Sequence, residues 1–140
     1  PSPGLPGAAL GCDTSQGRAC PVPGDGKAVK SCPLSAVQAQ DANIQTIEGL
    51  ADGDKLHPLQ QAFWDNHGLQ CGFCTPGFIM AGVYLLSQNS NPSDDEIRKG
   101  LEGNLCRCTG YVNIIKSVKD AAQKMGATQS AGTPVTAGGE

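Results

Sequence analysis

The amino-acid sequence predicts an α+β protein in which a strand-and-loop half is followed by a four-helix half. Three observations support this prediction. Proline and glycine interrupt residues 1–50, whereas apolar residues recur at helical spacing beyond residue 56. Helix-start signals accompany these apolar segments. The seven cysteines fall into two groups, one in each half. With 140 residues, 19 Gly and 10 Pro, we expect one domain or two small ones that need a bound centre or a partner for stability.

The composition argues against several classes of function. The net charge is −3 and the ten Lys and Arg are scattered, so a nucleic-acid partner is not expected. The apolar runs are too short to span a bilayer, and the first residues lack the pattern of a signal peptide. Seven cysteines without an export signal favour metal ligation in a reducing compartment, so we expect a cytoplasmic protein. Because the chain starts at Pro1 and not at Met, we also expect a segment upstream.

Residues 1–50 carry weak signals for β structure. Asp25 and Gly26 form a hairpin-turn signal, and residues 27–31 follow it as a short strand. Residues 43–48, with Ile44 and Ile47 as their apolar content, are a second strand candidate. Prolines between positions 21 and 33 remove donors from the ladder, so we expect this half to be fragile.

Two helices are predicted between residues 57 and 88. His57 and Pro58 open the first helix, which runs to residue 66, with Pro58 in its first turn. Thr75 is the N-cap candidate of the second helix, which ends before residues 89–92. The apolar residues expected to face inward are Leu59, Ala62 and Phe63 in the first helix and Ile79, Val83 and Leu86 in the second.

Two further helices complete the second half. Ser93 and Glu96 match a capping box and open a short third helix that carries Ile97 and Leu101. The fourth helix runs from about Val112 to Met125. Its expected inward residues are Ile114, Ile115, Val118 and Ala122. We therefore divide the chain into residues 1–50, a helical domain at 51–126 and a disordered tail of small residues at 127–140.

The second group of cysteines is a complete set of four thiols. Cys71 and Cys74 lie between the first two helices, and Cys106 and Cys108 lie between the last two. Two antiparallel helix pairs would bring both turns to one end of a bundle, where the thiols converge. Four thiolates suit zinc or an iron–sulfur cluster. Most zinc ribbons place C-x2-C pairs on β-hairpins, so the helical setting and the C-x-C spacing favour iron–sulfur, while zinc stays open.

The first group of cysteines matches an incomplete ligand set. Plant-type ferredoxins bind a cluster through C-x4-C-x2-C and a distant fourth cysteine. Cys12, Cys20 and Cys32 fit the first, third and fourth places of that pattern, and the second place is Gly17. The odd number of cysteines is therefore interpreted as eight with one ligand absent. Whether these three thiols hold a stable cluster is left open.

Four segments resemble a known family. They read GCDTSQ…AC (11–20), DGKAVKSC (25–32), LQCGFCTPGFIM (69–80) and GNLCRCTGY (103–111). Together they resemble the small [2Fe–2S] iron–sulfur subunit of molybdenum hydroxylases, the xanthine oxidase family, and are most similar to the aerobic carbon monoxide dehydrogenase type. The resemblance implies a plant-ferredoxin-like β-grasp domain followed by a four-helix domain, with one [2Fe–2S] cluster in each. It also implies a molybdopterin-binding large subunit and an FAD-binding medium subunit as partners.

The resemblance also implies roles for individual residues. The complete set of thiols would ligate the cluster nearest molybdenum, and the incomplete set would ligate the cluster nearer FAD. Gln70 would hydrogen-bond the pterin. Apart from the resemblance, Asn104 and Thr109 beside the cysteines are candidate hydrogen-bond donors to cluster sulfurs. The chain departs from the family at Gly17 and Arg18, where members have Cys-Gly. It also lacks most of the two strands and the helix that members carry before Cys12, so the β-grasp part is expected to be truncated.

Electron transfer without substrate chemistry is the function that this resemblance implies. Electrons would pass from a molybdopterin centre towards FAD through the clusters, and no catalytic residue is predicted in this chain. The sequence leaves the substrate open among carbon monoxide, an aldehyde, a purine and another N-heterocycle. Two other hypotheses remain at this point, a zinc-stabilised helical interaction module and a non-functional fragment.

Overall fold

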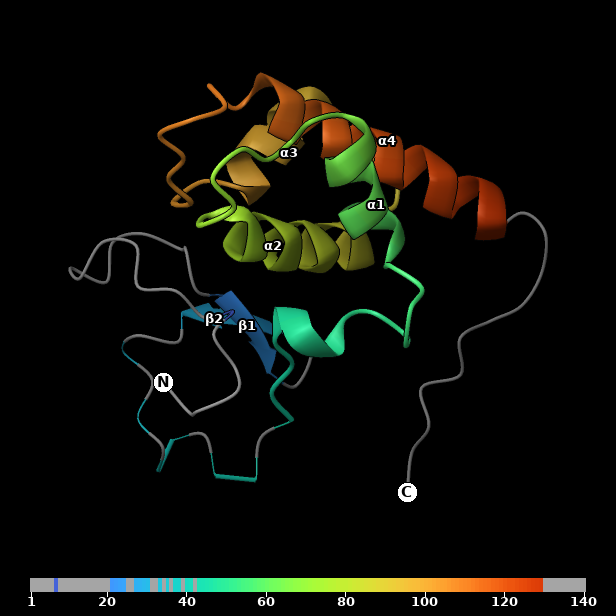
Figure 1. Cartoon of the computed structure of the whole chain (residues 1–140). Coiled ribbons are helices and arrows are strands. Elements are labelled where there is room, and N and C mark those ends of the chain that lie inside the picture. The colour runs from blue at the N-terminus through green and yellow to red at the C-terminus, as the bar shows by residue number, and fades with distance from the viewer. Residues whose placement is uncertain are drawn as a thin grey trace.

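The computed structural model describes residues 43–129 continuously, together with Gly7, the segments 21–24 and 27–30, and single residues between 33 and 41. Four α-helices dominate this part of the chain (Figure 1). They are α1 (Pro58–Asp65), α2 (Thr75–Gln88), α3 (Asp94–Gly100) and α4 (Val112–Gln129). The four predicted helices are thereby confirmed. Among the described residues, none of the helices is long and apolar enough to cross a membrane.

Two of the helices begin with reciprocal side-chain caps. At α1, Nδ1 of His57 accepts the N–H of Leu59 at 3.2 Å, and Gln60 accepts the N–H of His57 at 2.9 Å. At α3, Ser93 Oγ accepts the N–H of Glu96 at 3.3 Å, and the Glu96 carboxylate accepts the N–H of Ser93 at 2.7 Å. These bonds satisfy donors that a helix start leaves free. The predicted starts of both helices are confirmed.

Two helix ends differ from the sequence prediction. Thr75 is not the N-cap of α2 but its first helical residue, and Cys74 occupies the N-cap position without a side-chain cap bond. The Thr75 hydroxyl is buried and has no hydrogen-bond partner. At the other end, α4 continues to Gln129, beyond the predicted end near Met125. Gly126, which was expected to end the helix, lies inside it. Glycine lowers helix propensity but does not by itself end a helix.

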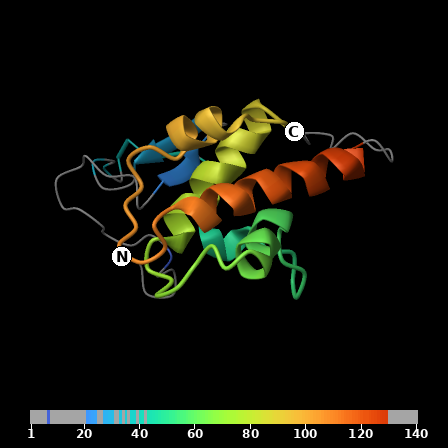
Figure 2. The same ribbon diagram turned by 90° about the horizontal axis from the view of Figure 1, so that it is seen from above.

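The hydrophobic core lies between the four helices. Helix α4 packs against α1 and α3 (Figures 1 and 2). Helix α2 lies between the other three helices and the two strands (Figure 1). The buried residues include most of those predicted to face inward, whereas Val83 and Ile115 are only partly buried. The largest fully buried side chains are Phe63, Phe78, Leu59, Met80, Ile97, Ile114 and Val118. This core holds the two loops that carry the cysteines.

The N-terminal half contains a short hairpin in its described part. Strands β1 (Pro21–Gly24) and β2 (Lys27–Lys30) pair antiparallel, which confirms the strand predicted after the turn. The second predicted strand, at 43–48, does not form as a strand: Ile44 alone is in a β-bridge, and a 3₁₀ turn, η1 (Ile47–Gly49), occupies the end of the segment. Ile44 and Ile47 are three residues apart, so in a strand their side chains would lie on opposite faces, and the segment offers no single apolar face to bury. Cys12, Gly17, Cys20 and Cys32 lie outside the described residues, as does most of the predicted β-grasp part.

Candidate metal centre

The two cysteine-bearing loops meet at one end of the helical bundle, as predicted. Cys71 and Cys74 lie in the loop between α1 and α2, and Cys106 and Cys108 lie in the loop between α3 and α4. The sulfurs of Cys71 and Cys108 are 3.5 Å apart. Cys74 interacts through its thiol with Cys106. All four side chains line one hollow of about 400 Å³ together with Phe73, Leu105, Arg107 and Tyr111. The thiols thus form two pairs within a single site.

Backbone conformation shapes both loops. Gly72, between the first two cysteines, has φ +82°, and Gly110, after the second two, has φ +65°. A Cβ atom at either position would meet nothing within 4 Å, so it is the left-handed conformation, and not lack of space, that favours glycine there. The carbonyl of Gly72 accepts the N–H of Thr75 at 3.2 Å, which closes the first loop directly before α2.

Cys106 receives more hydrogen bonds from the protein than the other thiols of the site. Its sulfur lies 3.1 Å from the hydroxyl of Thr109 and accepts the N–H groups of Thr109 and Cys108, both at 3.4 Å. Thr109 is therefore confirmed as a hydrogen-bonding neighbour of a candidate ligand. Asn104 is buried, and its side-chain amide donates one hydrogen bond to the carbonyl of Leu101 at 3.1 Å, so its predicted bond to a cluster sulfur stays a prediction.

In each pair of thiols, the pKa of one cysteine is lowered and the pKa of the other is raised. The N–H of Phe73, followed by the thiol of Cys108, lowers the pKa of Cys71, while the hydrogen bond to Cys71 raises the pKa of Cys108. Burial raises the pKa of Cys74 to about 12. At Cys106 burial also raises the pKa, but the Thr109 hydroxyl and the neighbouring N–H groups outweigh it and lower the pKa overall. Within each pair, one thiol therefore gives up its proton more readily than the other.

This donor set fits a binuclear cluster. A [2Fe–2S] cluster uses four cysteine thiolates, and the site offers four cysteine sulfurs from two loops, grouped two and two. Bound metal ions displace the remaining protons, since only thiolates ligate them. Within residues 43–129, no three His, Cys, Asp or Glu side chains are gathered around the position of one ion.

Further residues of the two loops flank the cysteines. Gln70 is exposed and directly precedes Cys71. Arg107 is exposed between two of the cysteines. Sequence reasoning assigned no role to Tyr111, whose hydroxyl accepts the N–H of Cys106 at 3.0 Å. Its position between Cys108 and the start of α4 is the sequence feature that could have pointed to this contact.

Comparisons with known proteins identify the family. Residues 46–119 match the family model described as "[2Fe-2S] binding domain". The nicotine 6-hydroxylase small subunit of Paenarthrobacter nicotinovorans is 48% identical over 122 residues, which cover 87% of this chain and 73% of that protein. Caffeine dehydrogenase subunit gamma of Pseudomonas sp. (strain CBB1) is 47% identical over 121 residues, covering 84% and 72%.

Solved structures agree with this result. A chain of quinoline 2-oxidoreductase from Pseudomonas putida 86 superposes with a TM-score of 0.84 at 44% identity, covering 90% of this chain and 78% of that one. Aldehyde oxidoreductase from Desulfovibrio gigas superposes with a TM-score of 0.82 at 39% identity, covering 94% and 15%.

The chain belongs to the small iron–sulfur subunits of the molybdenum hydroxylases, as its motifs predicted. The relatives named above refer to nicotine, caffeine, quinoline and aldehydes, and they do not support the carbon monoxide dehydrogenase type in particular. The family match does not favour the zinc-module alternative.

Proposed function

We propose that this chain is the electron-transfer subunit of a molybdenum hydroxylase complex. A [2Fe–2S] cluster at the site would accept and release single electrons on their way from a molybdopterin centre to FAD. The observation that carries the proposal is the convergence of four cysteines from two loops, paired two and two, inside the family's [2Fe–2S]-binding segment. The ligands we assign are Cys71, Cys74, Cys106 and Cys108.

The residues of the chain would hold, bury and orient the cluster. Cys74 and Cys106 are partly buried on the side of the core, whereas Cys71 and Cys108 are exposed. This arrangement would leave one edge of the cluster close to the surface, where electrons enter from another protein. The substrate chemistry would take place on the molybdenum subunit, which would also select the substrate.

The surface around the thiols is the face we assign to the molybdopterin-binding subunit. Phe73 and Leu105 line the hollow of the thiols, are apolar and expose more than half of their surface. Apolar groups that stay exposed together on one face are typical of protein interfaces. Gln70 lies beside Cys71 on the same loop, and we propose that it contacts the pterin of that subunit.

A second cluster is proposed for the N-terminal half, with Cys12, Cys20 and Cys32 as its ligands and the FAD-binding subunit as its neighbour. This proposal rests on the sequence pattern alone. The domain division at about residue 50 and a cytoplasmic location belong to the same proposal, and the comparison with relatives supports a subunit of a larger complex.

Iron and acid-labile sulfide per chain test the function directly. About two irons per chain would assign one cluster, and about four would assign both. The Cys106→Ser variant should lose the cluster of the helical half, and Cys32→Ser should leave that cluster in place. A colourless wild-type chain with one zinc and no electron paramagnetic resonance (EPR) signal on reduction would refute electron transfer.

A further inference from the structure

Tyr111 occupies a backbone conformation that side chains rarely adopt. Its φ is +70°, directly after Gly110 at +65° and directly before the first residue of α4. Glycine tolerates such angles without cost, whereas tyrosine does not. A non-glycine residue persists there only when its surroundings hold it in place, and such positions cluster at functional sites. The contacts of Tyr111 explain what holds it.

The tyrosine reaches Cys106 by two routes. Its phenol oxygen accepts the backbone N–H of Cys106 at 3.0 Å. Its own N–H donates to the hydroxyl of Thr109 at 3.2 Å, and that hydroxyl lies 3.1 Å from the sulfur of Cys106. One residue thus constrains both the amide and the thiol of a candidate ligand.

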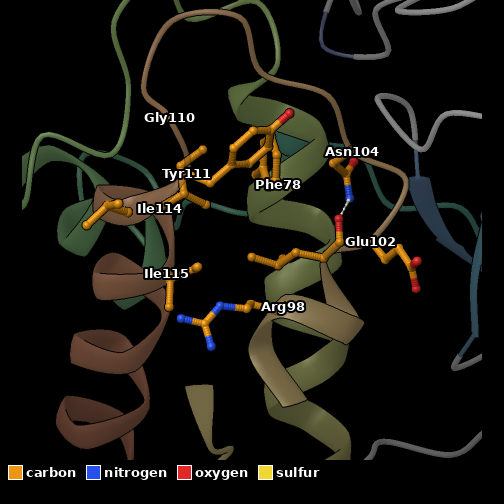
Figure 3. A pocket seen from close by; sticks show the side chains of 10 residues that line it. Phe78, Arg98, Glu102, Asn104, Gly110, Tyr111, Ile114 and Ile115 are labelled. Carbon is orange, nitrogen blue, oxygen red and sulfur yellow. Dashed lines mark hydrogen bonds between the residues drawn. The ribbon is translucent and has the colours of Figure 1, made fainter. Parts of the chain in front are cut away.

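The aromatic ring connects this loop with the other one. It packs edge-on against Phe78, with ring centroids 6.1 Å apart and planes at 67° (Figure 3). Phe78 is buried in the core on α2, and its N–H donates to the carbonyl of Cys74 at 3.2 Å. Contacts therefore run from Cys74 through Phe78 and Tyr111 to Cys106, and so join the two partly buried cysteines of the site.

The tyrosine also separates two hollows. On one side is the site of the four thiols, and on the other is a pocket of about 410 Å³ between α3 and α4, lined by Phe78, Arg98, Asn104, Ile114 and Ile115 among others (Figure 3). Tyr111 lines both of them. Its ring contacts Phe78 of the core, while its hydroxyl bonds the backbone of the cysteine loop.

We propose that Tyr111 is a positioning residue that sets the reduction potential of the helical-domain cluster by holding the hydrogen-bond donors around Cys106 in place. The proposal rests on the proposed function. Hydrogen bonds to ligand sulfurs stabilise the reduced, more negative state of a cluster. The donors at issue are the N–H groups of Cys108 and Thr109 and the hydroxyl of Thr109. Without the phenol hydroxyl, the loop that presents them loosens.

The test uses the full chain carrying its cluster. The Tyr111→Phe variant removes one oxygen and keeps the ring contact with Phe78. We expect a more negative midpoint potential of this cluster and a changed EPR spectrum. We also expect loss of iron to a chelator to be about tenfold faster, the scale for neighbours of metal ligands. Tyr84→Phe, at the only other tyrosine of the chain, is the matched control and should behave as wild type.

A double-mutant cycle separates positioning from general stability. Thr109→Val should shift the potential in the same direction, whereas Thr109→Ser, which keeps the hydroxyl, should have the wild-type potential. The double variant Tyr111→Phe with Thr109→Val should shift the potential by less than the sum of the two single shifts. A retained cluster with unchanged potential in Tyr111→Phe overturns the inference alone, even if the variant unfolds at lower temperature. Absence of iron and sulfide from the wild-type chain overturns the proposed function and this inference with it.

Discussion

Gly82 in α2 and Gly126 in α4 are both helical glycines, but their surroundings differ. A Cβ at position 82 would lie 2.8 Å from Cδ2 of Leu59, which is fully buried and cannot move aside freely. A Cβ at position 126 would meet nothing within 4 Å. The first glycine is needed for close packing of α1 against α2, and the second is a helix-weakening residue without a packing role.

The same substitution should therefore have opposite effects at these two positions. Gly126→Ala should raise the free energy of unfolding by about 0.5–1 kcal/mol, because alanine favours the helix. Gly82→Ala should lower it by about 1–3 kcal/mol, since overpacking outweighs the gain in helix propensity. Chemical denaturation of the two variants checks the prediction. Stabilisation of both to the same extent would contradict it.

Helix caps act at the scale of the element, and His57 makes one of them sensitive to pH. Its Nδ1 caps α1 by accepting an N–H, which requires a neutral imidazole. Burial lowers the pKa of His57 below its usual 6.5. The unfolded chain therefore binds a proton more readily than the folded chain. The stabilisation is fully present above pH 6.5 and is lost as the pH falls through the folded pKa.

Replacing this histidine should remove that pH dependence. His57→Asn keeps an oxygen acceptor at the N-cap and has no group that titrates in this range. Its unfolding temperature should change less between roughly pH 7.5 and pH 5 than that of wild type. His67→Asn, at the only other histidine, should keep the wild-type pH dependence. Equal pH profiles for the two variants would be evidence against a capping role that depends on the neutral imidazole.

The capping box of α3 gives a second prediction for an element. Ser93→Ala removes the acceptor for the N–H of Glu96 and should cost about 1 kcal/mol of stability. Ser90→Ala is the control in the preceding loop and should change stability by less than about 0.5 kcal/mol. Thermal or chemical denaturation measures both. A cost at Ser93 no larger than that at Ser90 would show that the cap contributes little.

At the scale of the whole molecule, ionic contacts attach α4 to its neighbours. Lys119 pairs with Asp94 at the start of α3 at 2.6 Å, and Lys124 pairs with Asp65 at the end of α1 at 3.2 Å. These pairs are half exposed, so the apolar core contributes most of the stability. The rigid bundle positions the thiol loops and leaves the apolar residues around them exposed.

That apolar surface leads to a prediction about assembly. Leu105→Lys should weaken binding to the molybdopterin-binding subunit by about tenfold or more, because it places a charge where we expect a dry contact. Iron content and the EPR signal should remain those of wild type. Trp64→Lys, a comparable change at an exposed residue of α1, should leave binding unchanged. Co-purification and measured affinity test this, and undiminished binding by Leu105→Lys would place the interface elsewhere.

Local signals made the helical half predictable. Pro58, the Ser93 and Glu96 pair and apolar residues at helical spacing act within one or two turns of the chain, so they determine helix starts and buried faces directly. The errors occurred where this local rule is insufficient. Two isoleucines three residues apart are too few to distinguish a strand from a turn. Nothing local to Thr75 distinguishes an N-cap residue from the first residue of the helix.

By itself, the sequence determined the family, the helices and the four candidate ligands, because caps, helical periodicity and cysteine spacing are properties of neighbouring residues. Only the tertiary structure decided how those ligands combine. Cys71 meets Cys108, and Cys74 interacts with Cys106, across loops that are more than thirty residues apart in sequence. The role of Tyr111 likewise depends on a ring from α2 that meets it in space. Such contacts arise from packing of the core, which no local pattern specifies.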